Sequence, residues 1–340
     1  MTTTSGSSGR RPALTRSVLA LAGIIAFAVF SFSIPYFFSV DNLINLLNEV
    51  ALAGILAMPA TFLIMCGQVD LSVGATAAFV GIVLAAAAPE SGLLTAVLLA
   101  VGAGLFIGLV NGLLVTAGGV PSFAATFGSM ALIRGLAYLI PSGLAITVAG
   151  FRSLGHTRPV LGIALPTLIF AAVAVIAAIL SGSAVGRRSR DTGRLAAIER
   201  VDGQRERRWV ITLFAVSGLS AALVGLIRTS QLGTGLPTAA IGIELTVVTA
   251  VLLGGGRLAG GRGSVAGTLL ALLMISVIDS GLSLANITAY AGQVFHAALL
   301  LLALVIDRPR RGWSASSTPS DVMPHPSAGL GRNHNHVRDP

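Results

Sequence analysis

The strongest constraint on the fold is a series of ten apolar segments separated by short polar ones. They are residues 17–38, 50–67, 71–88, 93–117, 121–140, 164–181, 209–227, 243–253, 264–284 and 288–306. A helix that crosses a bilayer needs about 20 mostly apolar residues. Only 10% of the residues are charged, against about 25% in soluble domains, so the chain lacks the charge to cover a soluble surface. We therefore predict an all-α fold: a polytopic transmembrane helix bundle of about ten spans. Eight spans with re-entrant segments remain the alternative.

Two of these segments are unusual. Residues 17–38 exceed the apolar core of a signal peptide and lack a small-residue cleavage site, so they predict an uncleaved first span. Residues 243–253 are too short to span alone, and we expect the glycine-rich residues 254–263 to extend them irregularly. Residues 41–49 are interpreted as a short amphipathic connector on the outer side.

The flanking segments complete the predicted domain organisation. Residues 1–16 form a cytoplasmic N-terminal tail, 17–306 the transmembrane domain, and 307–340 a cytoplasmic C-terminal tail. The last segment is rich in Pro, Ser and Gly, a composition typical of disorder.

The arginines orient this bundle. With both termini inside, 18 of the 22 basic residues lie in inner segments, eight of them within 182–208. Cytoplasmic loops carry an excess of basic residues, so this bias predicts a multi-pass plasma (inner) membrane protein with cytoplasmic termini. An eight-span chain keeps the same sidedness.

Several other functions are excluded or unsupported. The net charge of +9 would suit a nucleic-acid binder only on a soluble fold, so we expect no nucleic-acid partner. The single cysteine, Cys66, forms no internal disulfide, and no Cys/His spacing suggests a metal site. Every basic residue is Arg, and a Walker A loop requires Lys, so the chain lacks that nucleotide site. His156 and His296 look isolated, and no nucleophile–base pair emerges.

Polar residues inside apolar segments are costly, so each is a candidate for function. Residues 67–74, Gly-Gln-Val-Asp-Leu-Ser-Val-Gly, join two spans. They fit either a broken-helix junction on a substrate path or a tight turn with Asp70 as helix N-cap. Glu244 stands at the mouth of a span, where an interfacial position is favoured over a buried proton carrier. Asn111, Arg134 and Asp279 face either a polar lumen or a neighbouring helix, and for Asn111 we favour helix–helix hydrogen bonding.

At these segments the chain resembles the membrane permease subunit of sugar-type ABC importers, the ribose/xylose/galactose permease family. Residues 67–74 look like the family's Gly-Gly-Ile-Asp-Leu-Ser-Val-Gly signature. Residues 120–137 resemble its Pro-Phe-Ile-x-Thr-Leu-Gly…Arg-Gly-Leu-Ala segment, and 242–268 its Gly-x-Glu-Leu…Leu-Gly-Gly…Gly-Thr stretch. Three ordered motifs make the resemblance specific, and it runs from about residue 42 to 307. The departures are Gln68 in place of a glycine and Asp279-Ser280 where Asn-Asn is frequent.

The resemblance implies an alternating-access pore with several partners. These are a cytoplasmic ABC ATPase subunit, an extracytoplasmic solute-binding protein and a second permease copy or paralogue, all beside membrane lipid. It implies no cofactor in this chain, since the ATPase uses the ATP. It also implies that 182–208 is the coupling segment that docks on the ATPase; contact with lipid headgroups is the alternative. The family's pattern there is degraded and lacks its Asn. The matching candidates are Arg187, Arg188, Gly193, Ala196, Ala197 and Gly203.

We therefore expect the translocation subunit of an importer for a monosaccharide-like solute, not an enzyme. Asp70, Asn111, Glu244 and Asp279 are the candidate substrate-path residues. The alternatives are a nucleoside or branched-chain amino-acid ABC permease and, from another class, an ion-coupled secondary transporter.

Overall fold

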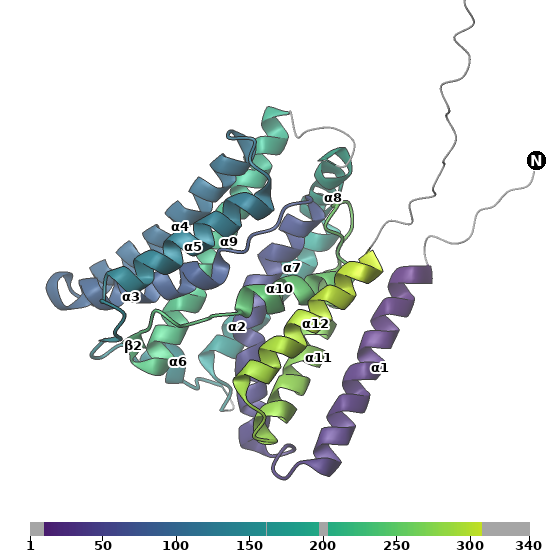
Figure 1. The fold of residues 1–340 in the computed structure, drawn as a ribbon, viewed down its shortest axis with the longest axis horizontal. Helices are drawn as coiled ribbons and strands as arrows, with labels where there is room; N and C mark the ends of the chain where they lie inside the picture. Colours follow the sequence, from purple (N-terminus) through teal and green to yellow (C-terminus); the bar gives the residue numbers. More distant parts are fainter. Residues whose placement is uncertain (1–9, 161, 197–202, 308–340) are drawn as a thin grey trace, which may run out of the picture. The chain divides into compact units, whose positions relative to one another are not determined.

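The computed structural model describes residues 10–160, 162–196 and 203–307, and within them it contains twelve helices and two short strands (Figure 1). The helices are α1 (Arg10–Ser33), α2 (Val40–Met65), α3 (Val73–Ser91), α4 (Leu93–Thr116), α5 (Ser122–Leu139), α6 (Ser153–His156), α7 (Leu165–Gly182), α8 (Ala184–Ala196), α9 (Gln204–Leu232), α10 (Ile243–Leu253), α11 (Val265–Leu284) and α12 (Ala289–Asp307). The strands are β1 (Ile146–Thr147) and β2 (Thr234–Gly235). Residues 308–340, and so nearly all of the predicted C-terminal tail, lie outside the described residues. Helix α1 begins at Arg10, within the segment predicted as the N-terminal tail.

The predicted helical membrane fold is confirmed. Seven helices (α2, α3, α4, α5, α7, α9 and α11) are long and apolar enough to cross a membrane. Three shorter apolar stretches, Ser17–Ser33, Ile243–Leu253 and Ala291–Val305, lie in α1, α10 and α12. Each of the ten predicted apolar segments thus overlaps one helix.

Helix α2 begins ten residues before the predicted span, so the expected outer connector at 41–49 is wrong. Ser39 is the N-cap, and its hydroxyl accepts a hydrogen bond from the Asn42 backbone N–H at 3.2 Å. The Asn42 side chain donates to the Phe37 carbonyl at 2.8 Å. Because Leu46 also packs with buried Phe37, this first stretch is anchored as helix.

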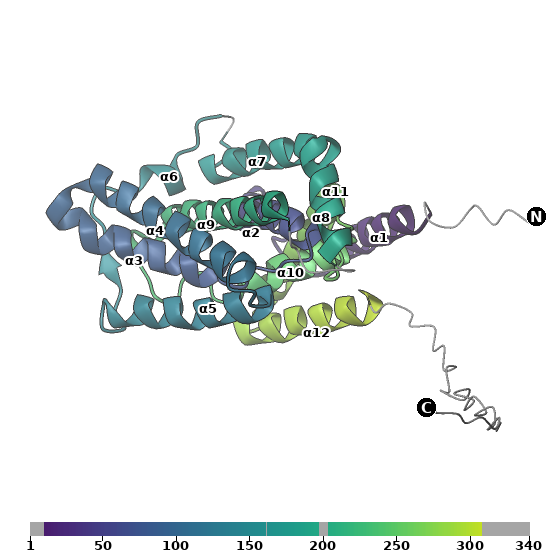
Figure 2. The same cartoon turned by 90° about the horizontal axis from the view of Figure 1, so that it is seen from above.

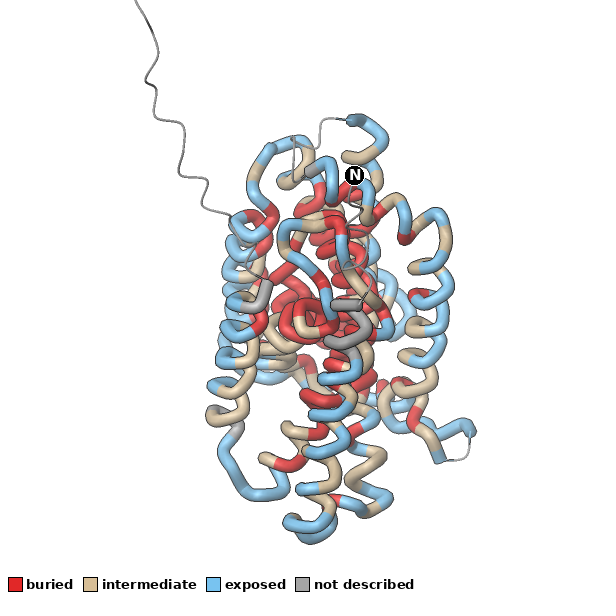
Figure 3. Tube along the Cα trace, turned by 90° about the vertical axis from the view of Figure 1, so that its right-hand side faces the viewer, coloured by how far each residue is buried: buried red, intermediate tan, exposed pale blue. Residues whose placement is uncertain are grey.

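Helix α2 forms the core of the bundle, since every residue from Val50 to Met65 is buried. It packs against α7, α9, α10 and α11, and α9 packs in turn against α3 and α4. Figure 2 shows α9 in the middle of the bundle, with α5 and α12 on one side and α6 and α7 on the other. Figure 3 shows that the buried residues lie mainly in the interior of the helix bundle.

The outermost helices are apolar on their exposed faces. In α7 only Pro166 and Ala177 are buried, although nearly all of its residues are apolar. Exposing such a surface to water would cost roughly 25 cal/mol per Å² of apolar area. Such a surface is typical of a membrane protein.

A short antiparallel pairing closes one end of the bundle. Ile146 of β1 lies opposite Gly235 of β2, and Thr147 lies opposite Thr234. Gly235 is close to α3, because a Cβ there would be 2.5 Å from the Gly81 carbonyl oxygen. The part of the Pro/Gly-broken segment that contains β1 is thereby fixed near the end of α9 and α3.

Candidate functional site

Residues 66–72, between α2 and α3, are non-helical backbone in the interior of the bundle. Gly67 adopts a φ of +74°, which a residue with a Cβ rarely adopts. The Val69 N–H donates to the Ser122 hydroxyl at 3.1 Å, and the Leu71 N–H donates to the Thr126 hydroxyl at 3.2 Å. Irregular backbone at membrane depth needs such protein partners, because lipid offers none. The junction between α2 and α3 is therefore non-helical and is held by the start of α5.

Asp70 lies at the centre of a buried polar network. One carboxylate oxygen accepts from the Ser72 backbone N–H at 3.0 Å and from the Ser72 hydroxyl at 2.7 Å. The other accepts from the Ser217 hydroxyl of α9 at 2.7 Å. The N-cap of α3 is Ser72, so the interpretation of Asp70 as the N-cap is wrong by two residues. Three donors on one carboxylate, only 5% exposed, join α9 to the α2–α3 junction.

The network continues into α4 and α5. The Asn111 side-chain amide donates to the Ser72 hydroxyl at 2.9 Å, and its carbonyl oxygen accepts from Ser129 at 2.5 Å. Asn111 has no exposed surface. The favoured interpretation of Asn111 as a helix–helix hydrogen-bonding residue fits this geometry.

Glu244 and Arg134 belong to a second polar group beside the first. The Arg134 guanidinium donates to the carbonyls of Pro237 at 2.7 Å and Ala239 at 2.9 Å, and so fixes the loop before α10. One Glu244 carboxylate oxygen accepts from the Gly242 N–H at 3.2 Å. The other is buried, with no hydrogen-bond partner among the described residues. A Cβ at Gly74 would lie 2.2 Å from that oxygen, so the glycine makes room for the carboxylate.

Asp279 forms a third group with a histidine that looked isolated in the sequence. The His296 Nε2 lies 2.8 Å and 2.9 Å from the two Asp279 carboxylate oxygens. Its Nδ1 lies 3.1 Å from the Thr246 hydroxyl. If Nε2 carries the proton, His296 donates to Asp279 and accepts from Thr246. The group therefore connects α10, α11 and α12.

The four predicted path residues thus fall into three groups. Asp70 and Asn111 are brought together through Ser72, and Glu244 reaches the same end of α3 through Gly74. Asp279 is not joined to them by a direct contact, but its group reaches α10, the helix of Glu244, through His296 and Thr246. Sequence reasoning missed Ser217, since a single hydroxyl on an apolar helix carries no distinguishing pattern, and it placed Thr126 in a family motif without predicting its contact with the α2–α3 junction. No cluster of three or more metal-binding side chains occurs within the described ranges.

The predicted coupling segment contains the amphipathic helix α8. Its buried face carries Gly193, where a Cβ would lie only 2.0 Å from the Met65 carbonyl oxygen and 2.5 Å from the Gly261 nitrogen. That nitrogen donates to the same oxygen at 2.8 Å. Helix α8 therefore lies directly against the end of α2 and the glycine loop that follows α10.

The opposite face of α8 is exposed and charged, with Arg187, Asp191 and Arg194 at helical spacing. Of the other predicted coupling residues, Ala196 ends α8, Ala197 lies outside the described residues, and Gly203 is the exposed N-cap of α9.

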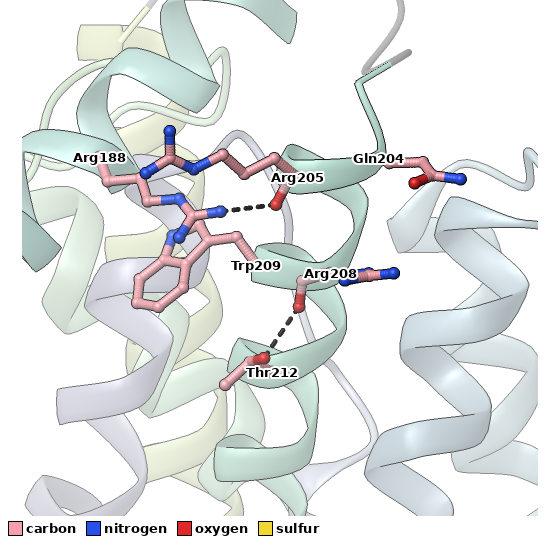
Figure 4. Close-up of a pocket in the computed structure, with 6 residues that line it drawn as sticks. All are labelled: Arg188, Gln204, Arg205, Arg208, Trp209 and Thr212. Atoms are coloured by element: carbon pink, nitrogen blue, oxygen red, sulfur yellow. Dashed lines mark hydrogen bonds between the residues drawn. The ribbon is translucent and has the colours of Figure 1, made fainter.

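Arg188 faces α9 instead. Its guanidinium lies 4.9 Å above the Trp209 ring and donates to the Arg205 carbonyl at 2.6 Å. The Trp209 indole N–H donates to the Ser189 hydroxyl at 3.2 Å. Beside them is a cavity of about 380 Å³, here termed the arginine pocket, lined by Arg188, Gln204, Arg205, Arg208, Trp209 and Thr212 (Figure 4).

Comparisons with known proteins identify what this architecture is similar to. Residues 42–304 match the family model described as "Branched-chain amino acid transport system / permease component". The ribose import permease protein RbsC of Haemophilus influenzae is 35% identical over 86% of this chain and 92% of its own length. The corresponding figures for RbsC of Bacillus subtilis are 33%, 81% and 87%.

The arabinose permease protein AraH of Azospirillum brasilense is 30% identical over 88% of this chain and 89% of its own length. No solved structure matches. These matches confirm the resemblance to the permease subunits of sugar importers.

Proposed function

The chain belongs to the branched-chain amino acid transport system / permease component family, and from that premise we propose that it moves a monosaccharide-like solute inward as the translocation subunit of an ABC importer. The observation that carries the solute class is the identity to ribose and arabinose permeases over nearly the whole of both chains. The chain itself is not an enzyme in this proposal. A separate ATPase subunit hydrolyses ATP, and this chain needs no cofactor.

We propose ten membrane segments with both termini in the cytoplasm. Seven long apolar helices and three shorter ones supply the segments, and α10 with its glycine loop forms the irregular one. The positive-inside bias of 18 of the 22 arginines supports the sidedness.

Impermeant maleimide labelling of intact cells tests this topology. Cys66, which is fully buried, is first replaced by Ser. Leu144→Cys, at an exposed position in the outer segment, should be labelled; Arg194→Cys on α8 should be labelled only after cell lysis. Labelling of Arg194→Cys in intact cells would overturn the sidedness.

We propose that the solute path runs along α3, α5 and α10. The acceptor capacity of Asp70 is engaged by three donors, whereas one Glu244 oxygen has no partner in the described structure. Glu244 is therefore the better candidate to accept a hydrogen bond from a sugar hydroxyl. Asp70 and Asn111 support the wall behind it, and Asp279 lines the α10–α11 side.

We propose that the ATPase docks on the exposed face of α8. Arg187, Asp191 and Arg194 present both charge signs there, which suits a specific polar interface. The buried face, through Gly193, contacts the end of α2. Movement of α8 would therefore be transmitted directly to the non-helical segment that begins at Cys66, one residue after the end of α2. A solute-binding protein on the outer side and a second permease copy complete the assembly.

A branched-chain amino-acid permease is the second candidate, because the family description names that class. A substrate panel separates the two. An ion-coupled carrier would instead transport without an ATPase and would stop when a protonophore is added.

The test is uptake into proteoliposomes that contain the permease together with an ABC ATPase subunit and a solute-binding protein from the same organism. Labelled ribose, arabinose and leucine are supplied outside the vesicles with the binding protein, and ATP is enclosed inside, so that complexes with the ATPase facing the lumen drive uptake. We expect uptake of a pentose that requires both ATP and the binding protein. Uptake by this chain alone, or of leucine only, would contradict the proposal.

A further inference from the structure

The arginine pocket lies at the junction of α8 and α9 and is strongly cationic. Three of its six described lining residues are arginines, and none of these six is a carboxylate. Figure 4 shows Arg205, Arg208 and Gln204 extending from the first turns of α9 while Arg188 lies over Trp209. The carboxylate of Glu206, in the first turn of α9 and close to Gly203, offsets the positive end of the helix dipole, so the cationic character of the pocket comes from its arginines.

The three arginines of the pocket differ in their contacts with the rest of the protein. Arg188 is committed to the Trp209 ring and to the Arg205 carbonyl. Arg205 and Arg208 are exposed, and neither forms an ion pair with a carboxylate in the described part of the chain. Two cationic side chains therefore remain for an anionic ligand.

The pocket is continuous with an apolar helix face. Along α9, Arg208, Thr212, Val216 and Leu219 follow one another at spacings of three or four residues, so they lie on one side of the helix. Val216 is 44% exposed and Leu219 is 38% exposed. Trp209 stands at the boundary between the charged and apolar parts, as aromatic residues do at a membrane interface.

We propose that the arginine pocket binds the phosphate of an anionic phospholipid of the cytoplasmic leaflet, with the acyl chains along the Val216–Leu219 face. The cationic end matches the headgroup and the apolar face matches the chains. An acidic segment of a protein partner would use the charge but not the adjoining apolar face. The inference rests on the proposed placement of α8 at the cytoplasmic surface.

Trp209 is itself the probe for the test. The chain has two tryptophans, so Trp313→Phe leaves Trp209 as the only one. The full-length protein is reconstituted in vesicles that mix phosphatidylcholine with phosphatidylglycerol, one of them brominated on its acyl chains. Quenching of Trp209 then reports which lipid occupies the neighbouring site. The measurement needs no ATPase, binding protein or solute, so its outcome is independent of transport.

We expect phosphatidylglycerol to be preferred at low salt by about fivefold for each arginine that contacts it, and the preference to fall at 1 M NaCl. Arg205→Gln/Arg208→Gln should abolish the preference, and Arg205→Lys/Arg208→Lys should keep most of it. The matched control, Arg187→Gln/Arg194→Gln on the other face of α8, should keep all of it.

Three results would overturn the proposal. Equal quenching by both lipids in the Trp313→Phe protein would do so even if the glutamine variant failed to fold. So would a preference that survives in the glutamine variant. A preference that disappears when the ATPase subunit is added would assign the pocket to that protein instead.

Discussion

Gly193 offers the sharpest test of how α8 is held, through the substitution Gly193→Ala. The added Cβ would lie 2.0 Å from the Met65 carbonyl oxygen and 2.5 Å from the Gly261 nitrogen. Ordinary contact begins near 3.4 Å, so α8 or the glycine loop must move by more than 1 Å. Both obstructing atoms are backbone, which cannot rotate away as a flexible side chain would.

Three terms set the size of the effect. Forcing a methyl group into a packed contact costs about 1–3 kcal/mol. Separating the Gly261 N–H from the Met65 carbonyl removes a 2.8 Å hydrogen bond in a confined place, which costs about 1–3 kcal/mol. The helix propensity of Ala over Gly returns about 1 kcal/mol. We expect a net loss of roughly 1–5 kcal/mol, together with a displaced α8.

The assay combines unfolding in detergent with ATP-driven uptake in proteoliposomes. Gly193→Ala should unfold earlier than the wild-type protein, and its uptake should fall more than the ATPase activity of the assembled complex. Gly102→Ala is the matched control, because this helical glycine has no atom within 4 Å of the added Cβ and should gain stability. Unchanged stability and uptake in Gly193→Ala would refute the close packing of α8 on α2.

Three further substitutions probe the polar groups. Asp70→Ala leaves three donors without an acceptor and should cost about 2–5 kcal/mol in denaturant unfolding, clearly more than Ser217→Ala, which removes one donor; equal losses would contradict the network. Glu244→Gln keeps the side-chain volume and should leave stability near that of the wild-type protein while lowering uptake at least tenfold. Normal uptake would remove Glu244 from the path. His296→Ala should cost about 1–2 kcal/mol, and adding Asp279→Ala should cost little more, because the two share one interaction. Additive losses would show that they act independently.

The sequence predicted the helices better than the contacts between them. Apolar length alone located a helix at each of the ten predicted segments, seven of them long enough to cross a membrane, because a bilayer sets a minimum apolar length for a spanning helix. It misjudged the start of α2. The polar Asn42 and Glu49 look like a connector, but tertiary packing of Phe37 and Leu46 extends the helix through them.

The sequence singled out individual polar residues but not the residues with which they form hydrogen bonds. Asp70 was recognisable from its cost in an apolar setting, but nothing local points to Ser217, 147 residues away. His296 looked isolated because Asp279 lies on the preceding helix and becomes its neighbour only when α11 and α12 pack. Pairings across helices depend on rotation about each helix axis, which apolar segments of uniform composition leave undetermined.

The short segment between Met65 and Asp70 joins the helix proposed to dock on the ATPase to the proposed solute path. At one end, the Met65 carbonyl accepts a hydrogen bond from Gly261 of the glycine loop, and Gly193 of α8 packs directly against it. Five residues later, Asp70 holds Ser72 and Ser217. The intervening backbone is tied to α5 rather than coiled into a helix, so it can change its hydrogen-bond partners without breaking an α-helical ladder. A rigid helix would transmit a push on α8 only along its axis. A non-helical segment can convert that push into a rearrangement of the network around Asp70, and this is the property that alternating access demands of a coupling element.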